Sequence, residues 1–200
     1  TVHLSQERFM AGEATQSPPW SVPLVLKYED SEGVHTSRML MAEKEMDYVL
    51  PAKGPVKWVY GNAGETGFYR THSAGGLAST LKNEPSSRVL SQAAANTLAP
   101  IEKIGYLGDL WALTRRGDLP IAGFMEALGH FRGNEARVLV SEICAYLDVL
   151  SNQMVLPSDR PFFAAFVDQQ LMPLWVKFGW DAAPDEDDER RLIRADLLWV

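Results

Sequence analysis

The feature that most constrains the fold is a change of hydrophobic period near the middle of the chain. From Ser86 onward, apolar residues recur at three- and four-residue steps, whereas upstream they alternate in short stretches. Residues 100–117 lie at this change and predict one helix, because Pro100 suits a first helical position and Gly117 suits the left-handed residue that ends a helix. The apolar residues of this segment fall on one side: Ile101, Ile104, Leu107, Leu110 and Trp111. We therefore expect two structurally different halves.

The upstream half is typical of β structure. About six short strands are expected near residues 2–6, 20–28, 34–41, 46–50, 57–60 and 68–71. Residues 30–33 and 62–67 have the composition of turns, and residues 11–19 that of a loop. Regular turn spacing favours a small antiparallel β-sandwich over residues 1–83.

The downstream half predicts helices only. Ser86 or Ser87 is expected to cap the first of them, and Pro120 to open a helix after the central one. Asn134 and Ser158 are expected to cap the next two, and a final helix follows Pro184. Two apolar stripes support these helices: Leu139, Ile143, Tyr146 and Leu150, then Phe163, Val167, Leu171, Leu174 and Phe178. Pro173 should bend its helix or mark its last turns.

Together these patterns predict an α+β, multidomain fold. The β-sandwich of residues 1–83 is followed by a solenoid-like array of antiparallel helices over residues 84–200, incomplete at its C-terminal end.

Composition excludes several classes of partner. The net charge is -7 and the pI is about 5.1, with basic residues scattered among more numerous acids, so we expect no nucleic-acid and no membrane partner. Cys144 is the single cysteine, so no disulfide can form within the chain, and its apolar neighbours predict burial. We interpret this as favouring a cytoplasmic location.

Motifs for catalysis are missing from the sequence. The four histidines, His3, His35, His72 and His130, have no second ligand at metal-binding spacing. Gly61, Gly64 and Gly67 are spaced as in a turn between strands and open no helix that could cradle a phosphate. We therefore predict no catalytic, cofactor-binding or metal-binding residue in this chain.

Three polar features are consistent with a functional or a structural role. His130 and Glu135 share a loop and are interpreted as a solvated turn. The acids Asp181 and 185–189 could hold a cation, but acids at a helix start followed by arginines are typical of helix stabilisation. Asp109, beside Gly105 and Gly108, is expected to bond a neighbouring backbone donor where another helix approaches closely.

Five motifs follow one another along the chain: residues 6–9 with 20–24, residues 57–59 with Asn62, residues 67–70, residues 104–113 with Gly117, and residues 178–180 with 192–194. In this order they resemble the C-terminal part of the zinc aminopeptidases of the aminopeptidase N and puromycin-sensitive aminopeptidase family. One departure is that Thr71, His72 and Ser73 follow Arg70, where the family usually has a valine and a later tyrosine.

The resemblance implies a β-sandwich third domain and the start of a helical fourth domain, with further helices beyond Val200. It also implies an upstream catalytic domain of the same polypeptide, whose zinc would serve the removal of N-terminal amino acids from peptide substrates. None of the zinc ligands is in this chain, so we expect the chain alone to be inactive and to act as a spacer and cavity wall that controls substrate access.

An alternative is a free-standing protein-interaction module whose helical repeats form the binding surface. An independent hydrolase with an unfamiliar site has little support beyond isolated acids. If the helical array does continue, Leu197, Leu198 and Trp199 would be exposed here, which predicts self-association of the truncated chain.

Overall fold

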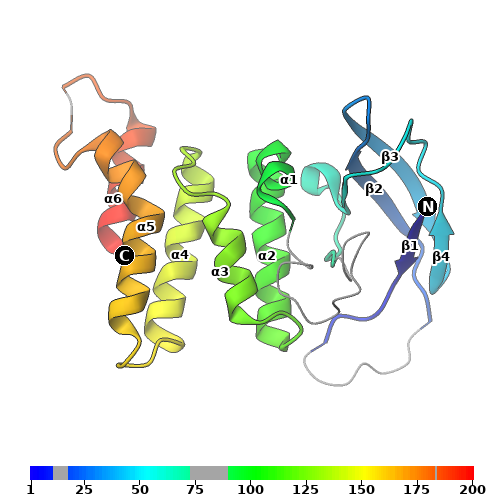
Figure 1. Ribbon diagram of the computed structural model, residues 1–200, viewed down its shortest axis with the longest axis horizontal. Coiled ribbons are helices and arrows are strands. Elements are labelled where there is room, and N and C mark those ends of the chain that lie inside the picture. The colour runs from blue at the N-terminus through cyan, green and yellow to red at the C-terminus, as the bar shows by residue number, and fades with distance from the viewer. Residues whose placement is uncertain (11–17, 73–89, 183) are drawn as a thin grey trace.

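The computed structural model describes residues 1–10, 18–72, 90–182 and 184–200. The strands gather at one end of an elongated molecule and the helices extend from them in a row (Figure 1). The predicted change from strands to helices is confirmed. The predicted boundary between residues 83 and 84, the caps Ser86 and Ser87, and most of the predicted loop at 11–19 lie outside the described residues.

Five strands form two small antiparallel sheets in the described ranges. β1 (Val2–Ser5) pairs with β4 (Glu45–Tyr48). β2 (Val22–Glu29) lies between β3 (Val34–Met41) and β5 (Trp58–Tyr60). These strands confirm the predicted antiparallel pairing of the upstream half.

A small core joins the two sheets. Leu26 and Tyr28 of β2 are buried with Leu50, since alternate residues of the strand point to the same face. Val2 of β1 and Tyr48 of β4 pack against this cluster, so both sheets contribute to it.

The prediction of a strand at 68–71 is wrong, because residues 67–71 make hydrogen bonds to a loop side chain and to the central helix. The side chain of Asn62 closes the preceding loop: its Nδ2 donates to the Gly67 carbonyl (3.0 Å) and its Oδ1 accepts from the Gly67 amide (2.9 Å). The amide of Thr71 then donates to a carboxylate of the central helix instead of to a strand.

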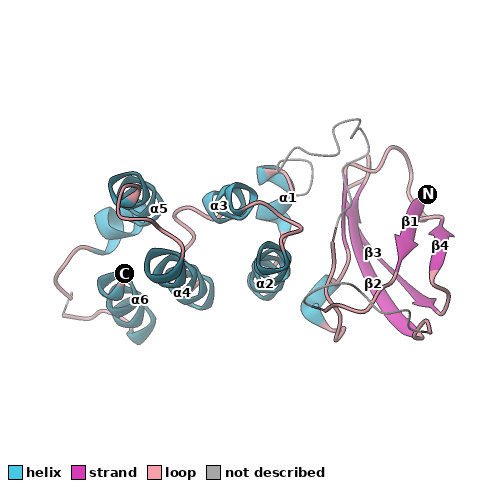
Figure 2. Ribbon diagram, turned by 90° about the horizontal axis from the view of Figure 1, so that it is seen from below, coloured by secondary structure: helices cyan, strands magenta, loops and turns pink. Residues whose placement is uncertain are grey.

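The helices are α1 (Gln92–Thr97), α2 (Pro100–Arg116), α3 (Ile121–Gly129), α4 (Arg137–Gln153), α5 (Arg160–Phe178) and α6 (Asp188–Trp199). Figure 2 shows α1, α3 and α5 in one row, and α2, α4 and α6 in a second row beside it. The predicted ends of α2 are confirmed, with Pro100 in the first turn and Gly117 in the left-handed region at φ 87°. No helix among the described residues combines the length and apolar character needed to cross a bilayer.

Three helix starts differ from the predictions. Ser91 caps α1, its Oγ accepting from the Ala94 amide. Asn134 accepts from the Ala136 amide and so forms a local turn just before α4. Ser158 bonds the Asp159 side chain and leaves the start of α5 without a side-chain cap. Short polar side chains bond nearby backbone in several ways, and the choice depends on the local turn.

The helices enclose one continuous core. Both predicted apolar stripes contribute to this core. All residues of the α4 stripe are buried. In the α5 stripe, Leu171 and Leu174 are buried and the other members are partly buried. Pro173 lies in the last turns of α5. At the C-terminal end, Leu198 and Trp199 are exposed as predicted, but Leu197 is buried because it faces this core.

Candidate functional site

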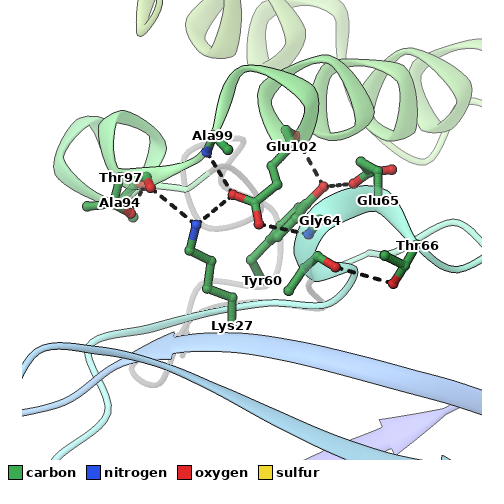
Figure 3. A network of polar contacts seen from close by, with 10 residues as sticks. Lys27, Tyr60, Gly64, Glu65, Thr66, Ala94, Thr97, Ala99 and Glu102 are labelled. Carbon is green, nitrogen blue, oxygen red and sulfur yellow. Dashed lines mark hydrogen bonds and ion pairs between the residues drawn. The ribbon is translucent and has the colours of Figure 1, made fainter.

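The most organised polar cluster of the described residues lies where the strands meet the helices (Figure 3). At its centre is Glu102 of α2, whose side chain is buried. Its Oε2 accepts from Lys27 Nζ of β2 (2.6 Å) and from the Ala99 amide (2.7 Å), while its Oε1 accepts from the Gly64 amide (2.9 Å). One carboxylate therefore binds a strand, a turn and the start of a helix.

The charges in this cluster are matched. Burial alone would raise the pKa of Glu102, but the hydrogen bonds from Lys27, Ala99 and Gly64 outweigh it and hold the pKa below its ordinary value. The ammonium of Lys27 also donates to the Thr97 carbonyl (3.3 Å), at the end of α1. Glu102 thus stays ionised at neutral pH, and its pair with Lys27 links β2 to both α1 and α2.

A second carboxylate, Glu65, lies against the backbone of α2. It accepts hydrogen bonds from the Tyr60 hydroxyl and from Asn62 Nδ2. A methyl group at Gly105 would overlap the Glu65 carboxylate, so a glycine is required there for this contact. Glu65 itself has φ 52°, a backbone conformation that costs a non-glycine residue free energy.

The neighbours of the two glycines of α2 can be compared with the prediction that another helix approaches there. At Gly105 the neighbour is a carboxylate from the short 3-10 helix η1 (Ala63–Glu65), and at Gly108 the nearest atom is Tyr146 Oη of α4. Burial raises the pKa of Glu65, with the charges of Asp109 and Glu102 adding to it, although the Tyr60 bond opposes the shift.

Asp109 is the third carboxylate and confirms its predicted structural role. Its Oδ2 accepts from the amide (2.8 Å) and the hydroxyl (2.9 Å) of Thr71, and Arg70 lies 3.5 Å from its Oδ1. Burial raises the pKa of Asp109, and the bonds from Thr71 reduce the shift. These contacts hold the end of the strand region onto α2.

The cluster is suited to joining two structures. Its carboxylates are occupied by lysine, arginine, hydroxyl or backbone donors. Across the ranges that the structure describes, no group of three or more His, Cys, Asp or Glu residues could hold a metal ion. The family resemblance implies zinc in an upstream domain, and the described residues of this chain form no site for it.

The other polar features have structural roles or lie apart. His130 is half-buried, with an Nδ1 atom that is buried and unpartnered, and burial lowers its pKa. Because His130 is half-buried, the predicted solvated turn is wrong for this residue. Glu135 pairs with Lys177 of α5. Cys144 is buried as predicted, which raises its pKa to about 12 and suppresses thiolate chemistry.

The acidic run at 185–189 stabilises its helix, as predicted. Asp187 caps α6 by accepting from the Arg190 amide (2.8 Å). Glu186 binds both terminal nitrogens of Arg194, at 2.6 and 2.8 Å, in a largely buried pair.

Sequence reasoning missed the junction itself. Lys27 and Glu102 are 75 residues apart, and no local pattern connects them. One signal was available: a glutamate at the third position of a helix commonly binds the amide before the helix, as Glu102 does for Ala99.

Comparison with known proteins gives one family. The model of the ERAP1-like C-terminal domain matches residues 58–200. The puromycin-sensitive aminopeptidase of Caenorhabditis elegans is 28% identical over 125 residues, which are 62% of this chain and 12% of that protein. Aminopeptidase M1-A of Oryza sativa subsp. japonica is 25% identical over 207 residues, covering 98% of this chain and 22% of the relative.

A third relative is archaeal. The tricorn protease-interacting factor F2 of Thermoplasma volcanium is 23% identical over 206 residues, covering 100% of this chain and 23% of that protein. The chain thus spans less than a quarter of the length of each of these relatives.

Proposed function

Because the chain belongs to the family of ERAP1-like C-terminal domains, we propose that it is the non-catalytic C-terminal region of a zinc aminopeptidase. In this proposal it acts as a spacer and as part of the wall around the catalytic cavity, and so limits access to peptides with a free N-terminus. Zinc and the residues that hold it would lie in an upstream catalytic domain of the same polypeptide.

The observation that carries the proposal is the junction around Glu102. A wall works only if its position relative to the rest of the enzyme is defined, and this carboxylate ties β2, η1 and α2 together through three donors. Trp58 and Tyr60 of β5 add to this, because they are buried in the helical core. The helices are therefore held at a set position on the strands.

Two finer structural statements belong to the same proposal. The two small sheets would form a β-sandwich domain over residues 1–83, and the two rows of helices would be the start of a solenoid-like array from residue 84. A cytoplasmic parent enzyme agrees with the lone, buried Cys144.

Enclosure is the mechanism by which such a region affects catalysis. A wall that restricts water and large substrates strengthens electrostatic interactions within the cavity and selects substrates by shape. The contribution of this chain would then appear in how hydrolysis depends on peptide length, while the reaction on a small reporter would depend on the catalytic domain.

A chimera tests this proposal. The 207-residue alignment with rice aminopeptidase M1-A defines the segment of that protein to be replaced by this chain. We expect the chimera to cleave aminoacyl reporters, and Glu102→Ala to change kcat/KM for long peptides at least about threefold while the reporter value stays within about twofold. Glu189→Ala, an exposed glutamate on α6, is the matched control and should change neither.

Two results would contradict the proposal. One is an equal effect of Glu102→Ala on the reporter and on every peptide length, since that would show a general loss of folding instead of altered access. The other is stoichiometric zinc or robust aminopeptidase activity in the isolated chain, which would place the chemistry here.

A further inference from the structure

One hydroxyl at the junction contacts two acceptors, although it has a single hydrogen (Figure 3). The Tyr60 hydroxyl of β5 lies within hydrogen-bond distance of Glu65 Oε1 of η1, and 3.2 Å from the backbone carbonyl oxygen of Glu102 in α2. A phenol donates one hydrogen and also accepts, whereas a carbonyl oxygen and an ionised carboxylate only accept. The contacts therefore admit two arrangements of hydrogen, which differ in the charge of Glu65.

The two arrangements satisfy these contacts to different degrees. If Glu65 is ionised, it takes the Tyr60 hydrogen, and no hydrogen then lies between the hydroxyl and the Glu102 carbonyl. If Glu65 carries a proton on Oε1, it donates to Tyr60 Oη, which in turn donates to the Glu102 carbonyl. In that state Glu65 Oε2 still accepts from Asn62 Nδ2 (3.2 Å). Only the protonated arrangement satisfies all three contacts.

The charges around Glu65 also favour its neutral form. Its carboxylate lies against the backbone of α2 between Glu102 and Asp109, which are at positions i and i+7 on one face of the helix. Lys27 lies 2.6 Å from the first of these acids, and Arg70 lies 3.5 Å from the second. Glu65 is contacted by uncharged donors, and no ion pair of Glu65 is found in the described part of the chain. A third negative charge there would be unbalanced.

The tyrosines near Glu65 hold their protons more firmly than Glu65 does. Burial raises the pKa of the Tyr60 hydroxyl above its ordinary value. Burial also raises the pKa of Tyr69, which donates to the Gly61 carbonyl (3.1 Å). Among the groups that touch the Tyr60 hydroxyl, Glu65 is therefore the one that can exchange a proton with solvent.

The backbone of Glu65 makes this position responsive. Its φ of 52° follows a φ of 70° at Gly64, so two successive residues are in the left-handed region. A non-glycine residue keeps such a conformation only where its surroundings hold it. The bonds from the Glu65 side chain to β5 supply part of that hold, so a change in its charge acts on a strained segment.

We propose that Glu65 carries a proton in the folded protein and thereby latches β5 onto α2, through hydrogen bonds from Glu65 to Tyr60 and from Tyr60 to the Glu102 carbonyl. Ionisation of Glu65 turns the Tyr60 hydrogen back to the carboxylate and removes the bond to α2. The link between strands and helices is therefore sensitive to pH. The inference goes beyond the proposed role in an aminopeptidase, because it concerns a junction within this chain and depends on no catalytic domain.

Nuclear magnetic resonance of the chain with isotopic label on its glutamate carboxyl carbons tests the proton on Glu65. Glu65→Gln assigns the resonance by its disappearance. We expect this resonance to titrate with a midpoint above the ordinary glutamate value of about 4.3. The wild type alone gives this result, so it does not depend on whether a variant folds.

Tyr60→Phe then shows the direction of the hydrogen bond. We expect the Glu65 midpoint to move to lower pH, because the variant removes the acceptor that stabilises the protonated acid. A hydroxyl that donated to an ionised Glu65 would give a move to higher pH instead. Tyr48→Phe is the matched control, since Tyr48 Oη bonds Ser37 (2.7 Å) away from the junction, and it should leave the midpoint unchanged.

Melting temperatures give a second readout of the latch. Stabilisation by a protonated Glu65 is present below about pH 4.3 and is lost as the pH rises through the pKa in the folded state. Glu65→Gln keeps an uncharged donor at this position, so its melting temperature should gain on that of the wild type as the pH rises. Glu45→Gln, at an exposed glutamate of β4, is the matched control and should show no such trend.

Three results would overturn the latch. The first is a Glu65 midpoint at or below the ordinary value of about 4.3. The second is a midpoint that rises or stays the same in Tyr60→Phe, and the third is an equal trend with pH for Glu65→Gln and Glu45→Gln.

Discussion

The strand half and the helical half are stabilised in different ways. The helical core is continuous from α1 to α6 and also includes Trp58 and Tyr60 of β5. The core between the sheets consists of Leu26, Tyr28 and Leu50 with a partly buried rim. Apolar burial thus dominates the stability of the helical half, whereas the strand half adds many polar contacts to a small core.

Those polar contacts are made by single side chains that bind several backbone groups. Gln6 bonds both the amide and the carbonyl of Trp20 and also the Glu43 carbonyl. Asp30 accepts from the amides of Glu32 and Lys53 and bonds His35. Such hydrogen bonds, exposed at Gln6 and partly buried at Asp30, supplement a core whose apolar area is small. Equal substitutions should therefore have unequal costs in the two halves.

The largest effect is expected from cavities in the core. Leu147→Ala in α4 should lower the free energy of unfolding by about 3–4 kcal/mol, because the side chain is fully buried in a continuous core that cannot collapse. Leu26→Ala in β2 should cost about 2 kcal/mol, since its small cluster lies nearer to solvent. Urea denaturation followed by circular dichroism measures both.

The control for this comparison is Leu156→Ala. Leu156 is 62% exposed, so its truncation should change the free energy of unfolding by about 0.5 kcal/mol or less. A cost at Leu26 that equals or exceeds the cost at Leu147 would show that the two cores are equally continuous.

Removal of the Glu102 carboxylate should rank next. Glu102→Ala leaves the ammonium of Lys27 with only the Thr97 carbonyl and should cost about 3 kcal/mol, because it leaves a buried charge uncompensated. Adding Lys27→Met should recover part of this loss, as an apolar side chain needs no counter-charge. If the two losses simply add in a double-mutant cycle, the junction is not a coupled pair.

Two glycines of α2 should respond with opposite signs. Gly108→Ala should stabilise by about 0.5–1 kcal/mol, because the nearest atom to the new methyl is Tyr146 Oη at 3.9 Å and alanine favours helix. Gly105→Ala should destabilise by about 1 kcal/mol, since the methyl displaces Glu65 from Tyr60 and Asn62. Thermal unfolding of both variants gives the signs, and stabilisation by both would mean that the Glu65 contact is dispensable.

The smallest expected effect is on how stability depends on pH, and Glu102 and Asp109 should change stability in opposite directions as the pH rises. The lowered pKa of Glu102 means that its stabilisation is present above about pH 4.3 and is lost as the pH falls through the pKa in the folded state. The raised pKa of Asp109 means that its contribution is present below about pH 3.9 and is lost as the pH rises through the folded-state pKa.

Melting temperatures across this range test both signs. The advantage of the wild type over Glu102→Gln should shrink on acidification, and its advantage over Asp109→Asn should shrink as the pH rises. Parallel trends for the two variants would contradict the opposite shifts.

The sequence predicted the elements with strong local signals. Residues 100–117 carry a proline, a periodic apolar side and a terminal glycine, and α2 has those ends. Tertiary contacts decided the rest: Asn62 and Asp109 bind the backbone of residues 67–71 and prevent a strand there. Leu197 faces the core and Trp199 faces solvent because of how α6 packs on α4, which the periodicity of one helix cannot specify.

The junction was inaccessible to sequence reasoning for a physical reason. A carboxylate three residues into a helix predicts a bond to the preceding amide, but the approach of Lys27 depends on how the whole sheet docks. Long-range polar pairs are a result of packing, so they become visible only once the packing is known.

The position of Trp58 and Tyr60 has a consequence for synthesis on the ribosome. These aromatic side chains belong to the helical core, yet they precede all the helices that the structure describes. A growing chain that has completed β5 therefore carries two aromatic side chains whose partners have not been translated. The sheet can pair at that stage, but Tyr60 meets the Tyr106 ring only after α2 has emerged, so β5 becomes fully buried after the strands have formed.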